Sequence, residues 1–131
     1  MMNRNILFKA KTLKDRELRI GSLIQTGCTT VIVNLGGTTL EATEVDPDTV
    51  QQLTNCYYKM RHVWEGDVFA TLANPDKRYT VYYDVVFDAF RVRWSDSKTT
   101  STAPLAAFLA EHPKMIYMGN IIDLDDNTDK P

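Results

Sequence analysis

One histidine and two acidic residues near the middle of the chain could carry acid–base or metal chemistry. His62, Glu65 and Asp67 form the pattern H-x-x-E-x-D. Histidines and carboxylates are common general acids and bases, and both bind divalent metals. Zinc sites, however, use helical H-E-x-x-H spacing or clustered cysteines and histidines, and these residues have neither. The simpler interpretation is that Asp67 stabilises a turn, so we expect no metal and no cofactor.

Cysteine chemistry is the second possibility. Cys28 and Cys56 are too few for a disulfide framework, and they lack the spacing of a metal site. A thiol nucleophile needs a histidine within hydrogen-bond reach, and the sequence does not place Cys56 beside His62 or His112. We therefore expect buried, reduced thiols and a protein that is not an enzyme. A small hydrolase built on these groups, or on the H-x-x-E-x-D residues, is the weakest alternative.

Four basic residues could instead bind nucleic acid. Arg91 and Arg93 share the outer face of one expected strand, and Lys77 and Arg78 stand at the far end of its neighbour. The aromatic residues of the first strand alternate to the opposite face, whereas a stacking platform needs exposed rings. The whole chain has 17 acidic and 15 basic residues and a net charge of −2, so no global field attracts nucleic acid or a membrane. Nucleic-acid binding is therefore an alternative and not the favoured function.

The acidic C-terminal segment imitates a calcium-binding loop. Asp123, Asp125 and Asn127 have the spacing of its first ligands. The sixth position is Thr128 where the loop requires glycine, and no glutamate follows at the twelfth. We expect residues 123–131 to be a flexible acidic tail.

The stretch from residue 63 to residue 69 organises the expected fold. Glu65-Gly66-Asp67 lies between two apolar runs and predicts a tight turn. Glycine adopts positive φ at little cost, and an aspartate side chain accepts hydrogen bonds from nearby backbone N–H groups. Trp64 and Phe69 should then be the largest side chains in the core.

Alternation of apolar and polar residues dominates the rest of the chain and predicts strands. We expect about eight to ten short antiparallel strands and hence a mainly β fold of small barrel-like or sandwich-like sheets. Gly36-Gly37 predicts a two-residue hairpin turn that sets Val33 opposite Leu40 on the core face. A second tight hairpin would set Phe87 opposite Phe90. Ala89 is a poor residue for positive φ, which leaves a loop longer than two residues as the alternative.

Two short helices interrupt the strands in this prediction. The first covers about residues 46–54, because Asp46 before Pro47 is a typical N-cap followed by proline at the first helical position. The second covers about residues 103–112, where an apolar stripe is followed by Pro113, which cannot continue a helix.

The length and composition fit one domain. Hydrophobic residues make up 44% of the chain and charged residues 24%, which are ordinary globular values. We expect residues 1–122 to form this domain, with a division into two β subdomains, about 1–62 and 63–122, left open. The sequence shows no signal-peptide pattern and no run of about 18 apolar residues, so we expect a cytoplasmic protein without membrane contact.

Three segments of the chain resemble the YopX-type proteins of phages and prophages. They are Phe8-Lys9-Ala10, residues 45–50 followed by 64–68, and Met118-Gly119-Asn120-Ile121. Their order and spacing match across nearly the whole chain. The shared structural motif comprises Trp64, Glu65, Gly66, Asp67, Gly119 and Asn120. Residues 54–60 lack the family's glycine-bearing turn, and Lys11-Thr12 replaces an aromatic-Asp pair.

The resemblance implies a mainly β protein encoded by a bacterial virus or an integrated one, in a family without an assigned biochemical activity. We therefore expect a non-enzymatic accessory protein in the cytoplasm of the bacterial host. Exposed edge strands commonly pair with another chain. The expected partner is a second copy of the chain in a homo-oligomer, or a host or phage protein.

Overall fold

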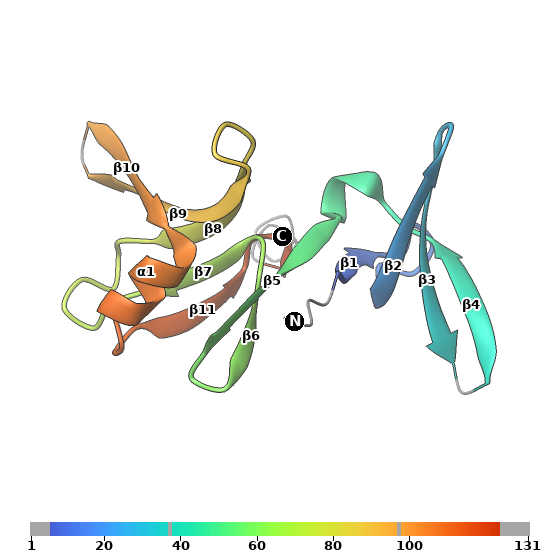
Figure 1. The fold of residues 1–131 in the computed structure, drawn as a ribbon, viewed down its shortest axis with the longest axis horizontal. Coiled ribbons are helices and arrows are strands. Elements are labelled where there is room, and N and C mark those ends of the chain that lie inside the picture. Colours follow the sequence, from blue (N-terminus) through green and yellow to red (C-terminus); the bar gives the residue numbers. More distant parts are fainter. Residues whose placement is uncertain (1–5, 37, 97, 124–131) are drawn as a thin grey trace, which may run out of the picture. The chain divides into compact units, whose positions relative to one another are not determined.

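The computed structural model describes residues 6–36, 38–96 and 98–123. Its fold is mainly β, as the sequence predicts, with strands in two antiparallel sheets (Figure 1). The strand order is β4-β3-β2-β1-β5-β6 in one sheet and β10-β9-β8-β7-β11 in the other. Both sheets are open in the described part of the chain, so the barrel-like form of the prediction is not found.

The structure contains eleven strands within these residues, rather than eight to ten. They are β1 (Phe8–Lys11), β2 (Leu18–Thr26), β3 (Thr29–Gly36), β4 (Thr39–Glu44), β5 (Gln51–Tyr58), β6 (Arg61–Trp64), β7 (Asp67–Ala70), β8 (Tyr79–Asp84), β9 (Ala89–Asp96), β10 (Thr99–Pro104) and β11 (Ile116–Asn120). A 3₁₀ helix, η1, covers Pro47–Thr49, and the helix α1 covers Leu105–Glu111.

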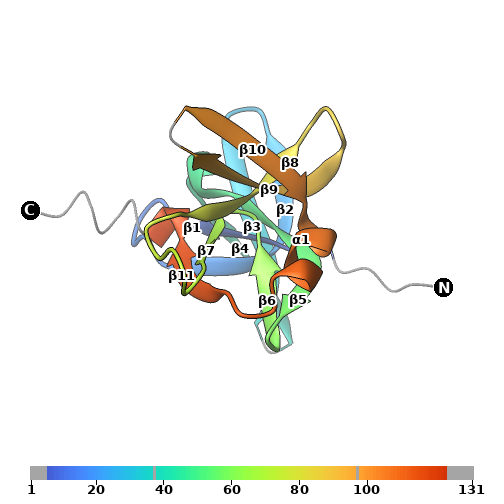
Figure 2. The ribbon, with the colours of Figure 1, turned by 90° about the vertical axis from the view of Figure 1, so that its left-hand side faces the viewer.

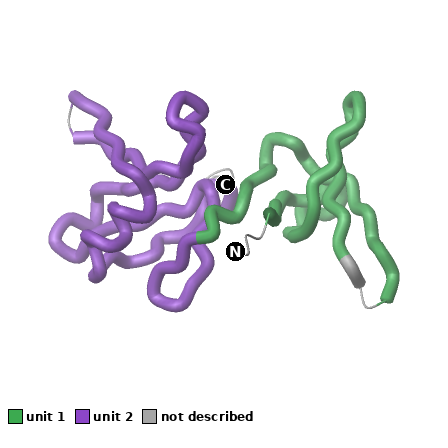
Figure 3. Tube along the Cα trace, in the orientation of Figure 1, with its two compact units in different colours: residues 1–55 green, residues 56–131 purple. Residues whose placement is uncertain are grey.

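The chain divides into two compact units, residues 1–55 and 56–131 (Figure 3). The division lies within β5 and not after residue 62, where the sequence offered a boundary. The physical reason is that Tyr58 of β5 belongs to the core of the second unit. The predicted tail lies outside the described residues apart from Asp123.

The first unit has a small core. Ala10, Ile32 and Val45 are fully buried in it. The β3–β4 hairpin pairs Val33 with Ala42, two residues from the predicted register, and Leu40 is exposed. The core prediction for Val33 and Leu40 was therefore wrong. The run around Ile32 is apolar on both faces of the strand, so alternation alone does not identify the buried face.

The predicted helix over residues 46–54 is wrong beyond its first turn. Asp46 is the N-cap of η1, and its Oδ1 accepts a hydrogen bond from Asp48 N at 3.0 Å. The chain then continues as β5, whose Gln51 and Gln52 pair with β1. A β ladder to a distant strand has overridden the local helical pattern.

The second unit builds its core between one face of its sheet and α1, which agrees with the helix predicted over 103–112. Phe108 of α1 packs against Tyr79 and Trp94, and its ring centroid lies 5.1 Å from that of Tyr79 and 5.5 Å from that of Trp94. Phe69 is buried in this core, as expected. Trp64 is only half-buried, and Val63 takes the fully buried position, so that part of the prediction was wrong.

The β8–β9 hairpin differs from the prediction by four residues. Phe90 lies opposite Tyr83 and not Phe87, and the last pair before the turn is Asp84 with Ala89. The turn is therefore longer than two residues, and residues 85–87 leave the ladder. In Figure 1 and in Figure 2 this turn projects from the body of the second unit.

Candidate functional sites

The turn over residues 64–67, here called the corner turn, is closed by a buried carboxyl group. Asp67 is 1% exposed, and its Oδ2 accepts a hydrogen bond from Trp64 N at 2.8 Å. Gly66 has a φ of +87°, a conformation that glycine adopts without strain. The Gly66 N–H donates to the Val81 carbonyl at 2.8 Å, which joins the turn to β8.

Residues from β11 complete this cluster. Asn120 is also 1% exposed, and its Nδ2 donates to Asp67 Oδ1 at 2.9 Å and to the Glu65 carbonyl at 3.2 Å. Gly119, with a φ of +119°, follows a register shift in the β11–β7 pairing. The structure thus brings together all six residues of the motif. Their polar groups face one another and the backbone, an arrangement typical of structural support.

The structure places His62 at the surface and the carboxyl of Asp67 in the interior. His62 is exposed on β6, where its ring lies 4.5 Å from that of Tyr57 and its Nε2 lies 3.4 Å from the Tyr57 hydroxyl. Both oxygens of Asp67 are engaged within the corner turn. No group of three or more histidine, cysteine or acidic side chains in the described residues could hold a metal ion.

Cys28 and Cys56 have different environments. Cys28 is exposed and Cys56 is half-buried, so the expectation of two buried thiols was wrong. Cys56 lines a surface pocket of about 360 Å³ whose other walls include Tyr58 and Leu109, and no histidine lines it. His112 is the C-cap of α1, and its Nδ1 lies 2.9 Å from the Phe108 carbonyl oxygen.

Three of the four basic candidates share one pocket. Lys77, Arg78 and Arg93 line a surface hollow of about 320 Å³ together with Trp94. The positive charge there is partly neutralised, because Lys77 Nζ lies 2.7 Å from an oxygen of Asp96. This contact with Asp96 raises the pKa of Lys77.

Arg91 has a different environment. Its side chain is mostly buried, and its Nε lies 3.8 Å from Asp84 Oδ2. Its Nη2 donates to Thr102 Oγ1 at 3.0 Å, and its guanidinium carbon lies 4.4 Å from the ring centroid of Phe87. Arg91 therefore supports the β8–β9 hairpin and does not line the basic pocket.

The most exposed apolar segment of the hairpin is residues 85–87, here called the apolar turn. Val85, Val86 and Phe87 are 80%, 85% and 62% exposed. The sequence analysis set Phe87 opposite Phe90 as a strand residue, because the alternation of β8 continues through residues 85–87. The acids at positions 84 and 88, which bracket the segment, were the available signal for a turn.

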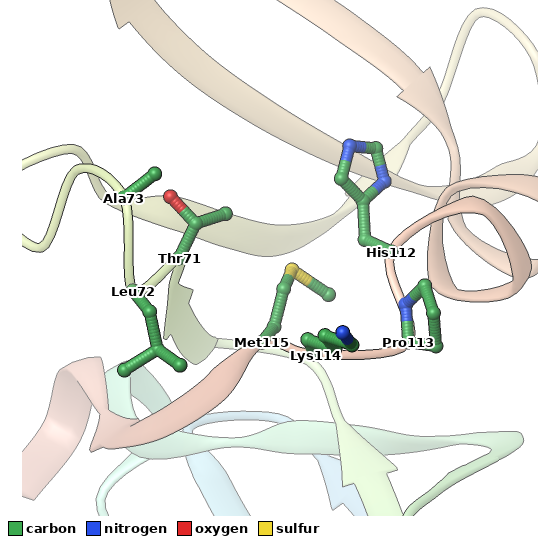
Figure 4. Close-up of a pocket in the computed structure, with 7 residues that line it drawn as sticks. All are labelled: Thr71, Leu72, Ala73, His112, Pro113, Lys114 and Met115. Carbon is green, nitrogen blue, oxygen red and sulfur yellow. The ribbon is translucent and has the colours of Figure 1, made fainter.

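A second feature that the sequence analysis missed is an apolar pocket of about 320 Å³ (Figure 4). The segment after β7 and the segment between α1 and β11 form it. Its lining residues are Thr71, Leu72, Ala73, His112, Pro113, Lys114 and Met115. These segments lie about forty positions apart in the sequence, so no local pattern points to the pocket. Hollows of this size with apolar walls commonly bind apolar side chains or small ligands.

Comparison with known proteins assigns no role to either feature. No protein-family model matches this chain, and no curated protein matches it. Within residues 6–36, 38–96 and 98–123, no helix has the length and apolar composition needed to cross a membrane.

Proposed function

We propose that this chain is a non-enzymatic accessory protein that works by binding another protein through the apolar turn. In keeping with the resemblance to YopX-type proteins, we place it in a phage or prophage, acting in the cytoplasm of its bacterial host. The proposal rests mainly on the exposure of Val85, Val86 and Phe87.

The energetics of burial favour a partner for this turn. Burying one valine or phenylalanine side chain stabilises a complex by about 1.5–3 kcal/mol. A few apolar or aromatic anchors at the centre of an interface supply most of its affinity. Contiguous exposed apolar residues on an ordered turn are therefore typical of a protein-binding surface.

The test compares two exposed positions of the second unit. Immobilised wild-type chain, Val86→Asp and Met60→Asp are exposed to cytosol of a bacterial host and to the free wild-type chain. Met60 is 99% exposed and lies on another turn, so it is the matched control. We expect wild type and Met60→Asp to retain a protein that Val86→Asp does not. A wild-type chain that retains neither itself nor a host protein would contradict the proposal.

A second candidate function is nucleic-acid binding at the basic pocket. The observation that favours it is the meeting of Lys77, Arg78 and Arg93 beside Trp94. Phosphate contacts from such residues make affinity fall steeply as salt rises. Fluorescence anisotropy with labelled single-stranded DNA and RNA tests it, with Arg78→Ala and Arg93→Ala as variants. Absence of binding at low salt would remove this function.

A further inference from the structure

We infer that the partner of the apolar turn is a second copy of this chain, whose apolar pocket receives the turn. This inference rests on the proposed function, since it names the occupant of the same surface. The contact would join two different surfaces, the turn of one copy and the pocket of the next.

The apolar turn is held ready for binding by hydrogen bonds beneath it. Asp84 Oδ1 accepts from Val86 N at 2.9 Å and from Phe87 N at 3.4 Å. The Tyr82 hydroxyl donates to Asp84 Oδ2 at 3.1 Å, and Arg91 lies beside the same oxygen and over one face of Phe87. A turn that is already ordered loses little conformational entropy when it docks.

The apolar pocket offers the complementary surface. Figure 4 shows Met115 at its floor, with Leu72 and Ala73 on one side and His112 on the other. Leu72 is 71% exposed, so its side chain gains burial if an apolar group enters. A concave site with apolar walls fits a protruding apolar turn better than it fits a flat or charged surface.

The charges around the two surfaces are of opposite sign. Asp84 is paired with Arg91, so the exposed Asp88 is the acid that remains beside the apolar turn. The exposed Lys114 is the charged side chain among the residues that line the pocket. Like turns meeting tip to tip would bring acids together, whereas a turn entering the pocket brings an acid towards a lysine. Complementary rim charges of this kind favour one docking mode over another.

The positions of the two surfaces determine the type of assembly. In Figure 1 the β8–β9 turn lies at the upper right of the second unit, and the segments that form the pocket lie at its lower left. A chain therefore does not fill its own pocket, and each docked pair retains one unused turn and one unused pocket. Such head-to-tail contacts continue until a ring closes or a filament forms. We expect assemblies larger than a dimer.

The experiment uses sedimentation velocity and light scattering of the full chain over a hundredfold range of concentration. Val86→Asp disables the turn, and Leu72→Asp disables the pocket. We expect wild type to assemble beyond a dimer and each variant alone to remain monomeric. An equimolar mixture of the two variants should form a dimer and nothing larger, because it contains one working turn and one working pocket per pair.

Matched controls carry the same substitution at other exposed positions. Leu40 is 71% exposed, like Leu72, and lies in the first unit, so Leu40→Asp should assemble as wild type does. Met60→Asp should do the same. Circular dichroism checks that each variant is folded, and Val86→Ser and Leu72→Ser replace any variant that is not. Charge reversal by Lys114→Glu should weaken assembly severalfold, and adding Asp88→Lys should restore it.

Three outcomes would overturn the inference. They are a monomeric wild type at every concentration, assembly of Leu72→Asp at wild-type strength, and a variant mixture that stays monomeric. A monomer that retains a host protein through the apolar turn would leave the proposed function standing and refute only the second copy as partner. A monomer that retains nothing would refute both.

Discussion

The corner turn and the apolar turn are stabilised by the same kind of hydrogen bond, but the apolar residues of one are buried and those of the other are exposed. Each is stabilised by an aspartate carboxyl that accepts backbone N–H groups, Asp67 in one and Asp84 in the other. Asn120 of β11 covers the first carboxyl, and the apolar residues beside it enter the core. At the second, Arg91 lies beneath the turn and the apolar residues remain exposed. The comparison shows that the local turn does not decide burial, which depends on the elements that pack over it.

The largest expected effect separates the two phenylalanines that follow the two aspartates. Phe69 is 1% exposed in the core, so Phe69→Ala should reduce the free energy of unfolding by about 3–5 kcal/mol. Phe87→Ala should change it by less than about 0.5 kcal/mol, because an exposed side chain leaves no cavity. Urea denaturation measures both. Equal losses at the two sites would mean that the apolar turn is part of the folded core.

Removing the buried carboxyl should have the next largest effect. Asp67→Ala removes the acceptor of Trp64 N and one of the two acceptors of Asn120 Nδ2, and each buried hydrogen-bonding group that loses its partner costs about 1–3 kcal/mol. We expect a loss of about 3 kcal/mol in the free energy of unfolding by the same method. Asp67→Asn keeps one acceptor oxygen and should lose less. If Asp67→Ala is as stable as wild type, the corner turn does not depend on this carboxyl.

The sequence predicted the corner turn well, and the apolar turn badly, for a physical reason. The Glu65-Gly66-Asp67 signal is local, since glycine and aspartate act within their own turn. Residues 85–87 continue the alternation of β8, and the acids at positions 84 and 88 were a weaker local signal than that alternation. The register of the β3–β4 hairpin was missed in the same way, because a shift by two residues preserves the alternation.

Long-range pairing accounts for the other differences. Residues 51–54 carry a pattern compatible with a helix, but β1 supplies a strand for Gln51 and Gln52 to pair with. The helix α1 was predictable because Pro104 and Pro113 mark its two ends within the sequence. The apolar pocket joins two segments far apart in the chain, and the basic pocket contains Lys77, Arg78 and Arg93 but not Arg91. The alternation of side chains along the strand did not reveal that Arg91 contacts Asp84 and Phe87.

A smaller effect is expected when the aspartate under the apolar turn is removed. Asp84→Ala takes away the acceptor of Val86 N and Phe87 N near the surface, where water can replace it. We expect a loss of about 1 kcal/mol in the free energy of unfolding. Self-association, measured by sedimentation, should weaken about tenfold because the turn must be ordered on binding. Asp88→Asn is the matched control, and it should leave stability unchanged because asparagine tolerates the positive φ of +51° at this position. Unaltered association of Asp84→Ala would show that the order of the turn does not contribute.

A third turn stabilised by an aspartate lies in the first unit, where Asp46 is the N-cap of η1. Removing the partner of this carboxyl should give the smallest effect on stability. The hydrogen bond from Arg16 and that from Asp48 N lower the pKa of Asp46 below the ordinary value of an aspartate. A carboxyl whose pKa is lower in the folded state stabilises the fold above its unfolded pKa of about 3.9. That contribution is lost as the pH falls through the folded pKa.

The Arg16–Asp46 pair is 2.8 Å apart and largely solvated, with side-chain exposures of 45% and 24%, so screening by water limits its contribution. Arg16→Ala should therefore cost less than about 1 kcal/mol at pH 7. The difference in free energy of unfolding between wild type and Arg16→Ala should shrink as the pH is lowered from 5 to about 2.5. Denaturation of wild type and Arg16→Ala at several pH values measures this difference. The control is the same comparison of the two proteins in high salt. A difference that persists at the lowest pH would mean that Arg16 acts through packing and not through the charge of Asp46.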